Sequence, residues 1–417
     1  MKILQLCKKF PYPLKDGESI AVTHMGRALK ELGCEITLLS MNTQKHYMEI
    51  SDLPKDFNHY KDINTVYLDN RIKVLDAFIN LFRTASYHVS RYISPAFENA
   101  LIRLLKEEDF DIVQLETLYL APYIDIIRKY SNAAIVMRSH NVEHEIWDRI
   151  AENEINIVKK SYLRYLTQKL KKFEVNSLNK CDMFVAITER DLQHFKKLGL
   201  QKPSFVAPVG LDNTQYLADA HGFNKAKLSI GFIGSLDWRP NIEALDWFLK
   251  NVWDLMSNEY PDLSLHIAGR NTPDWLYKLG SKNVFVHGEV RNAQEFINQH
   301  PILVVPILSG SGIRVKILEG MLLGRTVITT TVGLEGINAK HAQEVMIADT
   351  PKGFMECLRY CYENRDEILR IGQRAQVFAS KNYDNLDITK RLLIKINQSI
   401  LNNKYQLENQ TRIKIQQ

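Results

Sequence analysis

The sequence contains no long apolar run and few cysteines. Its longest apolar segment, Ile302 to Leu308, includes Pro306 and is far shorter than the roughly 20 residues that a membrane-spanning helix needs. The five cysteines include no C-x-x-C pair, which indicates reduced thiols in a cytoplasmic protein rather than a disulfide framework. The N-terminal residues read as one short strand interrupted by lysines, so we expect no secretory signal and a soluble chain.

The chain also lacks a strong charge and a dinucleotide motif. Its net charge is +6 over 417 residues, which argues against nucleic acid as a partner and is compatible with a phosphorylated ligand or an anionic membrane surface. The first strand–helix turn has no G-x-G-x-x-G run, which disfavours a dinucleotide oxidoreductase.

Two series of short apolar runs alternate with helical stretches. The first series begins with Lys2 to Cys7 and the second with Ser229 to Ile233. This alternation predicts two Rossmann-like α/β domains, each a doubly wound parallel sheet. We place an N-terminal domain at residues 1–210, a C-terminal domain at 211–380, and a helix with a polar tail at 381–417. Such sheets bind ligands outside the carboxyl ends of their strands, so we expect an anionic ligand in a central cleft that both domains face.

A glycine-rich loop precedes a predicted helix in the second series. Gly310 and Gly312 allow backbone N–H groups to approach a phosphate closely. The helix that opens near Ile313 adds partial positive charge at its start. A loop of this kind is weak evidence by itself, because it also occurs in ordinary turns.

Three charged side chains lie in the first two turns of that helix. Arg314 and Lys316 add two positive charges, and arginine can bind phosphate oxygens in a bidentate way. Glu319, one turn further on, can accept hydrogen bonds from two ribose hydroxyls. A solvated surface helix is the alternative, but basic residues near a helix start oppose its dipole, a cost that a bound anion offsets. The segment therefore favours a nucleotide diphosphate.

The segment resembles the donor-binding motif of glycosyltransferase family 4, in the bacterial branch with the pattern G-x-G-x-R-x-K-x-x-E. Other segments resemble the same branch in chain order: Arg138–Glu143 with its histidine motif, Thr188–Asp191, Pro208–Asp212, Gly234–Asn241, Ala268–Asn271 and His287–Val290. The resemblance covers nearly the whole chain. It implies the GT-B fold and transfer of a sugar from a nucleotide diphosphate sugar with retention at the anomeric carbon.

The resemblance also assigns the site residues. His140, Arg314, Lys316 and Glu319 would act at the reacting groups, with His140 against the donor sugar or the acceptor. The donor-binding residues that it implies are Gly17, Ser235, Arg239, Arg270, Val290, Gly310, Ser311 and Gly312.

Two positions depart from the family pattern. Many members carry a glutamate where this chain has Ser311, and an arginine where it has Ser235. The phosphate charge would then fall to Arg239, Arg314 and Lys316, and the identity of the donor sugar is the property most affected.

Neither a metal ion nor a cofactor is expected. Asp109 and Asp111 form a D-x-D pattern, which binds a divalent metal in other glycosyltransferases, but they precede a strand and so lie at the amino end of the predicted sheet. Cationic side chains and helix dipoles would stabilise the leaving diphosphate instead. The lysine-rich region from Ile155 to Lys180 has an apolar face. A solvated face over a domain core is favoured there over a membrane-surface patch.

These features predict a cytoplasmic bacterial glycosyltransferase of surface polysaccharide synthesis. Its partners would be a nucleotide sugar donor and a glycan or lipid-linked acceptor, with a peripheral contact at the inner face of the membrane left open. A nucleotide-sugar epimerase is one alternative, which would need carboxylates for proton transfer. A non-catalytic nucleotide-sugar-binding subunit is another, suggested by Ser311.

Overall fold

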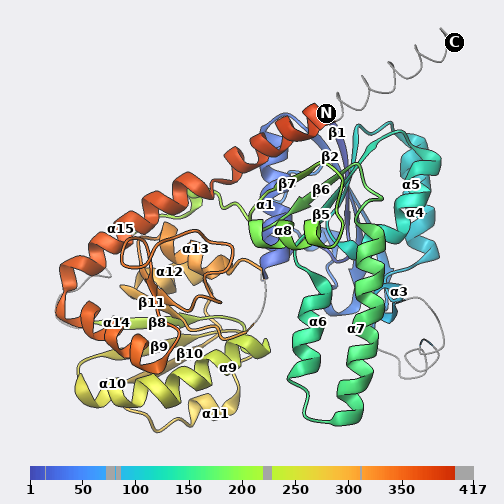
Figure 1. Cartoon of the computed structure of the whole chain (residues 1–417). Helices are drawn as coiled ribbons and strands as arrows, with labels where there is room; N and C mark the ends of the chain where they lie inside the picture. The colour runs from blue at the N-terminus through green and yellow to red at the C-terminus, as the bar shows by residue number, and fades with distance from the viewer. Residues whose placement is uncertain (15, 72–79, 81–85, 219–227, 310–311, 400–417) are drawn as a thin grey trace, which may run out of the picture. The chain divides into compact units, whose positions relative to one another are not determined.

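The computed structural model describes residues 1–14, 16–71, 80, 86–218, 228–309 and 312–399. The chain divides into two compact units (Figure 1). The first unit contains Met1–Gly210 and the residues from Asn385 on, and the second unit contains Leu211–Asp384. The second unit is therefore an insertion into the first.

The first unit is built on a seven-stranded parallel sheet with the order β3-β2-β1-β4-β5-β6-β7. The strands are β1 (Lys2–Cys7), β2 (Glu35–Thr43), β3 (Asp62–Leu68), β4 (Ile112–Leu115), β5 (Ala134–Ser139), β6 (Met183–Ala186) and β7 (Ser204–Val206). Strands β2 and β3 are added on one side of β1, and strands β4 to β7 are added on the other side. The carboxyl ends of β1 and β4 therefore mark the switch point, where ligands of such sheets bind.

Helices cover both faces of this sheet. They are α1 (Gly17–Glu31), α3 (Tyr87–Ser90), α4 (Pro95–Glu107), α5 (Ile124–Tyr130), α6 (Glu143–Glu152), α7 (Ile157–Ser177), α8 (Glu189–Lys197), a helix at 385–399, and the 3-10 turns η1 (Gln44–His46), η2 (Ile50–Asp52) and η3 (Leu118–Tyr123). Several begin at a capping side chain: Ser94 accepts from the Phe97 N–H and Thr188 from the Asp191 N–H.

Two apolar clusters form the core of the first unit. One packs Leu4 and Val113 against α4 and α5. The other packs Ile3 and Val22 against the helix at 385–399. Because both faces of the sheet are covered, its strands read in the sequence as nearly continuous apolar runs.

The second unit repeats this plan with six parallel strands in the order β10-β9-β8-β11-β12-β13. The strands are β8 (Ser229–Ile233), β9 (Ser264–Ala268), β10 (Val284–Gly288), β11 (Ile302–Val305), β12 (Thr326–Thr329) and β13 (Met346–Ile347). The helices are α9 (Arg239–Phe248), α10 (Asp254–Glu259), α11 (Asp274–Tyr277), α12 (Ala293–Asn298), α13 (Val315–Leu322), α14 (Pro351–Glu363) and α15 (Arg365–Asn382), with the 3-10 turn η4 (Asn213–Gln215) and the π-turn η6 (Leu249–Trp253).

The prediction of two parallel α/β sheets is confirmed. The strand at Met346–Ile347 was not predicted, since two residues carry no periodicity. The lysine-rich region from Ile155 to Lys180 becomes helical only at Ile157, where α7 begins after the capping residue Asn156. Among the described residues, no helix combines the length and apolar character that crossing a membrane requires.

Candidate functional site

In the second unit the switch point lies between β8 and β11. The loop after β8 leads into α9, and the loop after β11 leads into α13. Both helices thus begin at the switch point, where unpaired N–H groups and the positive ends of the helix dipoles favour an anion. The structure therefore brings together the two segments that the sequence singled out around positions 234–241 and 309–319.

Lys316 in the first turn of α13 reaches across to the end of β8. Its Nζ donates hydrogen bonds to the carbonyl oxygen of Ile233 (3.1 Å) and to Oδ1 of Asn241 (2.8 Å). A Cβ atom at position 234 would lie 2.7 Å from this Nζ, so Gly234 leaves room for the lysine. Burial, and then the positive charge of Arg314, lower the pKa of Lys316 to about 7.

Arg314 stands at the N-cap position of α13. The helix begins at Val315, so the prediction that it opens near Ile313 with Arg314 inside it is corrected by about two residues. The guanidinium is buried and lies over the indole ring of Trp238, 5.7 Å from the ring centroid. This stacking fixes the positive charge next to the loop after β8.

The glycine loop before α13 is described in part. Gly312 is buried and has a φ of 80°, a conformation that glycine adopts without strain. Its carbonyl oxygen accepts a hydrogen bond from Nη1 of Arg314 (2.6 Å). Gly310 and Ser311, both predicted donor-binding residues, lie outside the described residues.

The other predicted arginines have different surroundings. Arg270, just after β9, donates from Nε and Nη2 to Oγ of Ser235 (3.4 and 3.3 Å), and Ser235 donates to Asp237 (2.5 Å). An arginine therefore does reach the loop after β8, although position 235 itself is a serine. The side chain of Arg239 is 64% exposed and forms an ion pair with Glu243 (2.5 Å) one turn further along α9.

Val290 follows the edge strand β10, two places from β8 in the sheet order. The structure thus places it at the same carboxyl edge as Lys316 but not at the switch point. It is partly buried.

Glu319 lies one turn after Lys316 on α13. Its Oε1 accepts a hydrogen bond from the hydroxyl of Tyr216 (3.2 Å). Burial raises the pKa of both groups. The contact raises the pKa of Tyr216 further, whereas the hydrogen bond from Tyr216 lowers the pKa of Glu319 without outweighing burial. Sequence reasoning missed Tyr216, which belongs to no motif and has no periodic neighbour that would mark it.

In the first unit, His140 lies beside a buried carboxylate that the sequence did not reveal. Glu116, directly after β4, accepts hydrogen bonds from Nε2 of His140 and Nη1 of Arg138, both at 3.1 Å. It also accepts from the side-chain amides of Gln5 and Gln114, both at 2.5 Å. Glu116 is thus the centre of a network at the switch point of the first unit.

The ionisation of this network follows from its contacts. Burial acts to raise the pKa of Glu116, but Arg138 and the hydrogen bond from His140 outweigh it and lower that pKa to about 2. Burial lowers the pKa of His140. Because an ionised carboxylate can only accept, Nε2 of the neutral His140 carries the proton, and its Nδ1 keeps a lone pair for a hydroxyl donor.

Gly17 is the first residue of α1, directly after the capping residue Asp16. Lys8 and Lys9, which follow β1, form ion pairs with Glu18 (3.3 Å) and Asp16 (2.7 Å). The start of α1 around Gly17 therefore carries ion pairs with the residues that follow β1. The sequence pattern did not predict these pairs.

The start of α6 is capped from another helix. The backbone N–H groups of Glu143 and His144 donate to the two oxygens of Glu174 on α7 (3.1 and 3.3 Å). The carboxylate of Glu143 accepts from the hydroxyl of Tyr119 (2.9 Å). These contacts give the residues after His140 a structural role.

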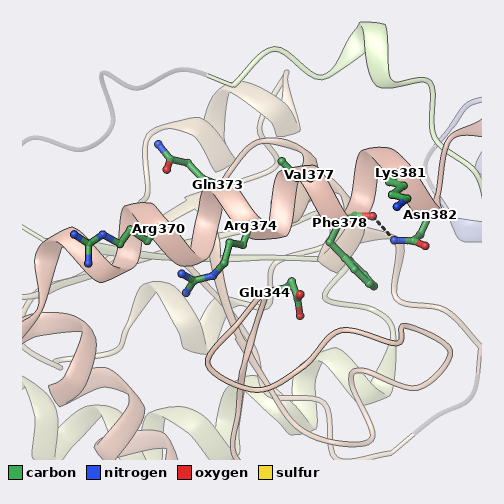
Figure 2. Close-up of a pocket in the computed structure, with 8 residues that line it drawn as sticks. All are labelled: Glu344, Arg370, Gln373, Arg374, Val377, Phe378, Lys381 and Asn382. Atoms are coloured by element: carbon green, nitrogen blue, oxygen red, sulfur yellow. Dashed lines mark hydrogen bonds between the residues drawn. The ribbon is translucent and has the colours of Figure 1, made fainter.

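Two further features lie apart from these residues: the predicted D-x-D pair and a hollow along α15. Asp111 precedes β4, at the amino end of the sheet as predicted, and accepts from the Lys2 N–H (2.7 Å). Among the described residues, no group of three His, Cys, Asp or Glu side chains is placed to hold a metal. Figure 2 shows a hollow along α15 that none of the predicted site residues lines; its lining is Glu344, Arg370, Gln373, Arg374, Val377, Phe378, Lys381 and Asn382.

Two protein-family models match the chain. The Glycosyltransferase Family 4 model matches residues 16–215, and the Glycosyl transferases group 1 model matches residues 227–364. The chain carries two glycosyltransferase domains. The family 4 domain contains the His140–Glu116 network, and the group 1 domain contains the Lys316 site.

The two glycosyltransferase domains have structural neighbours of the GT-B type. Anabaena Alr3699/HepE in complex with UDP-glucose is 13% identical, with 95% of this chain and 100% of that chain covered and a TM-score of 0.65. Sucrose-phosphate synthase from Thermosynechococcus elongatus is also 13% identical, with 96% and 100% covered and a TM-score of 0.70. These likenesses confirm the predicted fold class.

A relative with a similar sequence is the uncharacterized 44.6 kDa protein in the cps region of Klebsiella pneumoniae. It is 24% identical over 397 residues, which cover 92% of this chain and 97% of the relative. The similarity therefore extends through both glycosyltransferase domains.

Proposed function

We propose that this protein is a retaining, metal-independent glycosyltransferase that transfers a hexose-type sugar from a nucleotide diphosphate sugar to a glycan or lipid-linked acceptor. The pathway proposed for it is surface polysaccharide synthesis, in keeping with the cps-region relative. UDP-glucose is the first donor to test, because the similar Anabaena protein was solved with it.

The observation that carries the proposal is the group of cationic features at the second switch point. Lys316, Arg314 and the starts of α9 and α13 meet where β8 and β11 end. As the glycosidic bond of the donor breaks, negative charge grows on the β-phosphate, and these groups would stabilise it without a metal ion. Glu319 would exchange its contact with Tyr216 for the ribose hydroxyls, and Nδ1 of His140 would contact the sugar or the acceptor.

The first test is a panel of nucleotide sugars measured by thermal shift and then by sugar transfer to extracted glycan and lipid-linked acceptors, with and without EDTA. Lys316→Ala should lose most transfer activity while remaining folded, whereas Lys250→Ala, on the exposed side of the same unit, should remain active. Equal activity of Lys316→Ala and the wild type would reject the phosphate role. The anomeric configuration of the product, read by NMR, tests retention.

Two outcomes of the same panel favour the alternatives. Release of an epimerised nucleotide sugar in the absence of any acceptor would favour the epimerase. Tight donor binding with no turnover on any acceptor would favour a non-catalytic nucleotide-sugar-binding subunit.

A further inference from the structure

The turn between α6 and α7 presents three strongly exposed aliphatic side chains. Ile155, Ile157 and Val158 are 94%, 79% and 80% exposed, and among the described residues the next most exposed large apolar side chain is Leu217 at 76%. Figure 1 shows α6 and α7 side by side, with the turn that joins them away from the sheet of the first unit. Adjacent aliphatic side chains left in water at the end of a helical hairpin indicate a surface that is covered by something else.

The charge of α7 indicates what covers it. The seventeen residues 157–173 contain six lysines and arginines and no acidic residue. Leu166 and Leu170 are buried, whereas Arg164, Lys171 and Lys172 are exposed. Within the described part of the chain none of these three forms an ion pair, although Lys159 at the tip pairs with Glu154 (2.6 Å). An exposed cationic stripe thus continues from the apolar tip.

Against the solvated face that the sequence alone favours for this region, we propose that this hairpin docks on an anionic lipid bilayer, with Ile155, Ile157 and Val158 inserted between the lipid headgroups and the cationic stripe against the phosphates. Apolar insertion and attraction to anionic lipid together produce stable peripheral binding. A second copy of the chain is a poorer occupant, because two cationic stripes would repel each other. The hairpin begins at Glu143, three residues after His140, so docking would tether the sheet edge that carries His140 to the membrane surface.

The test is co-sedimentation of the full chain with vesicles of phosphatidylcholine alone or mixed equally with phosphatidylglycerol. The wild type should bind the mixed vesicles. The triple variant I155S/I157S/V158S should lower the partition coefficient on the order of 100-fold, since three aliphatic side chains no longer leave water. Its matched control, L217S/L255S/V377S, replaces three side chains that are also well exposed (76%, 57% and 68%) and should bind like the wild type.

A second variant separates the charge contribution. R164Q/K171Q/K172Q should weaken binding about fivefold for each cation removed and flatten the dependence on salt. The proposal is overturned if the wild type ignores the mixed vesicles, if I155S/I157S/V158S binds as well as its control, or if that variant changes only the oligomeric state in gel filtration. None of these readouts depends on sugar transfer, so their failure is distinct from failure of the proposed function.

Discussion

Lys316 illustrates how a cation can be held in a site that favours its neutral form. Because burial lowers its pKa to about 7, part of the free protein carries a neutral lysine at neutral pH. A bound diphosphate favours the charged form and raises that pKa. Under the proposed function, the affinity for UDP should therefore fall as pH rises above about 7, up to tenfold per pH unit. Calorimetric titrations from pH 7 to 9 check this, with Lys316→Met as the control whose weaker binding should no longer vary with pH; equal slopes for both proteins would contradict it.

Glu116 gives a second prediction, for the stability of the first unit. Its pKa is lowered from 4.5 in the reference state to about 2 in the folded state, so it stabilises the fold above about pH 4.5, and this contribution is lost as pH falls toward 2. Glu116→Gln leaves Arg138 buried without a carboxylate, and should reduce the free energy of unfolding by about 3–5 kcal/mol at pH 7. Denaturant unfolding at pH 7 and pH 3 should show a smaller pH dependence in the variant.

The exposed Glu107→Gln, on α4, is the matched control for that experiment. It should change the free energy of unfolding by less than about 0.5 kcal/mol at either pH. If both variants behave alike, the buried network does not stabilise the unit.

Sequence reasoning located single residues only where they lie in a motif. Lys316 and Glu319 were predicted as site residues from their spacing, and both lie on α13. Glu116 and Tyr216 contact His140 and Glu319 from distant positions in the chain. One sequence without an alignment contains no signal for such pairs, because an isolated Glu or Tyr has the same appearance on a surface as in a buried network.

At the scale of elements, the sequence also did not predict where two backbones approach each other closely. The start of most strands could be predicted because buried parallel strands are apolar throughout. The packing of α15 could not: a Cβ atom at Gly372 would lie 2.0 Å from the carbonyl oxygen of Gly324, so the helix rests directly on the backbone after α13. No pattern distinguishes this glycine from one that merely ends a helix.

Gly372→Ala should therefore change the free energy of unfolding through two effects of opposite sign. Alanine favours a helix interior by about 1 kcal/mol over glycine, but the clash must push α15 away from Gly324, which typically costs about 1–3 kcal/mol. We expect net destabilisation of the second unit, measured by denaturant unfolding. Gly280→Ala, where nothing lies within 4 Å, should not destabilise it; a more stable Gly372→Ala would show that the helix yields freely.

At the scale of the whole molecule, the chain returns to its first unit after completing the second. The sequence shows a helix and tail at the C-terminus but carries no sign of where they pack. In the structure, Ile388, Leu392 and Ile396 are buried in the cluster that contains Ile3 and Val22. Residues almost four hundred positions apart thus share one core.

Leu392→Ala should lower the free energy of unfolding of the first unit by about 2–5 kcal/mol, because it leaves a cavity in that core. Ile394→Ala, on the exposed side of the same helix (49% exposed), should have a small effect. Calorimetric melting of the full chain measures both. Similar effects of the two substitutions would mean that the C-terminal helix is not part of the core.

The return of the chain to its first unit at Asn385 affects how the protein folds during synthesis. A ribosome releases residues in order, and domains generally fold as units as they emerge. Here the N-terminal sheet lacks its covering helix at 385–399 until the whole inserted unit has been made, whereas the inserted unit has all of its own residues earlier. The first unit is therefore started before the second and completed after it, and a stop in translation before residue 385 would leave its apolar face open to aggregation.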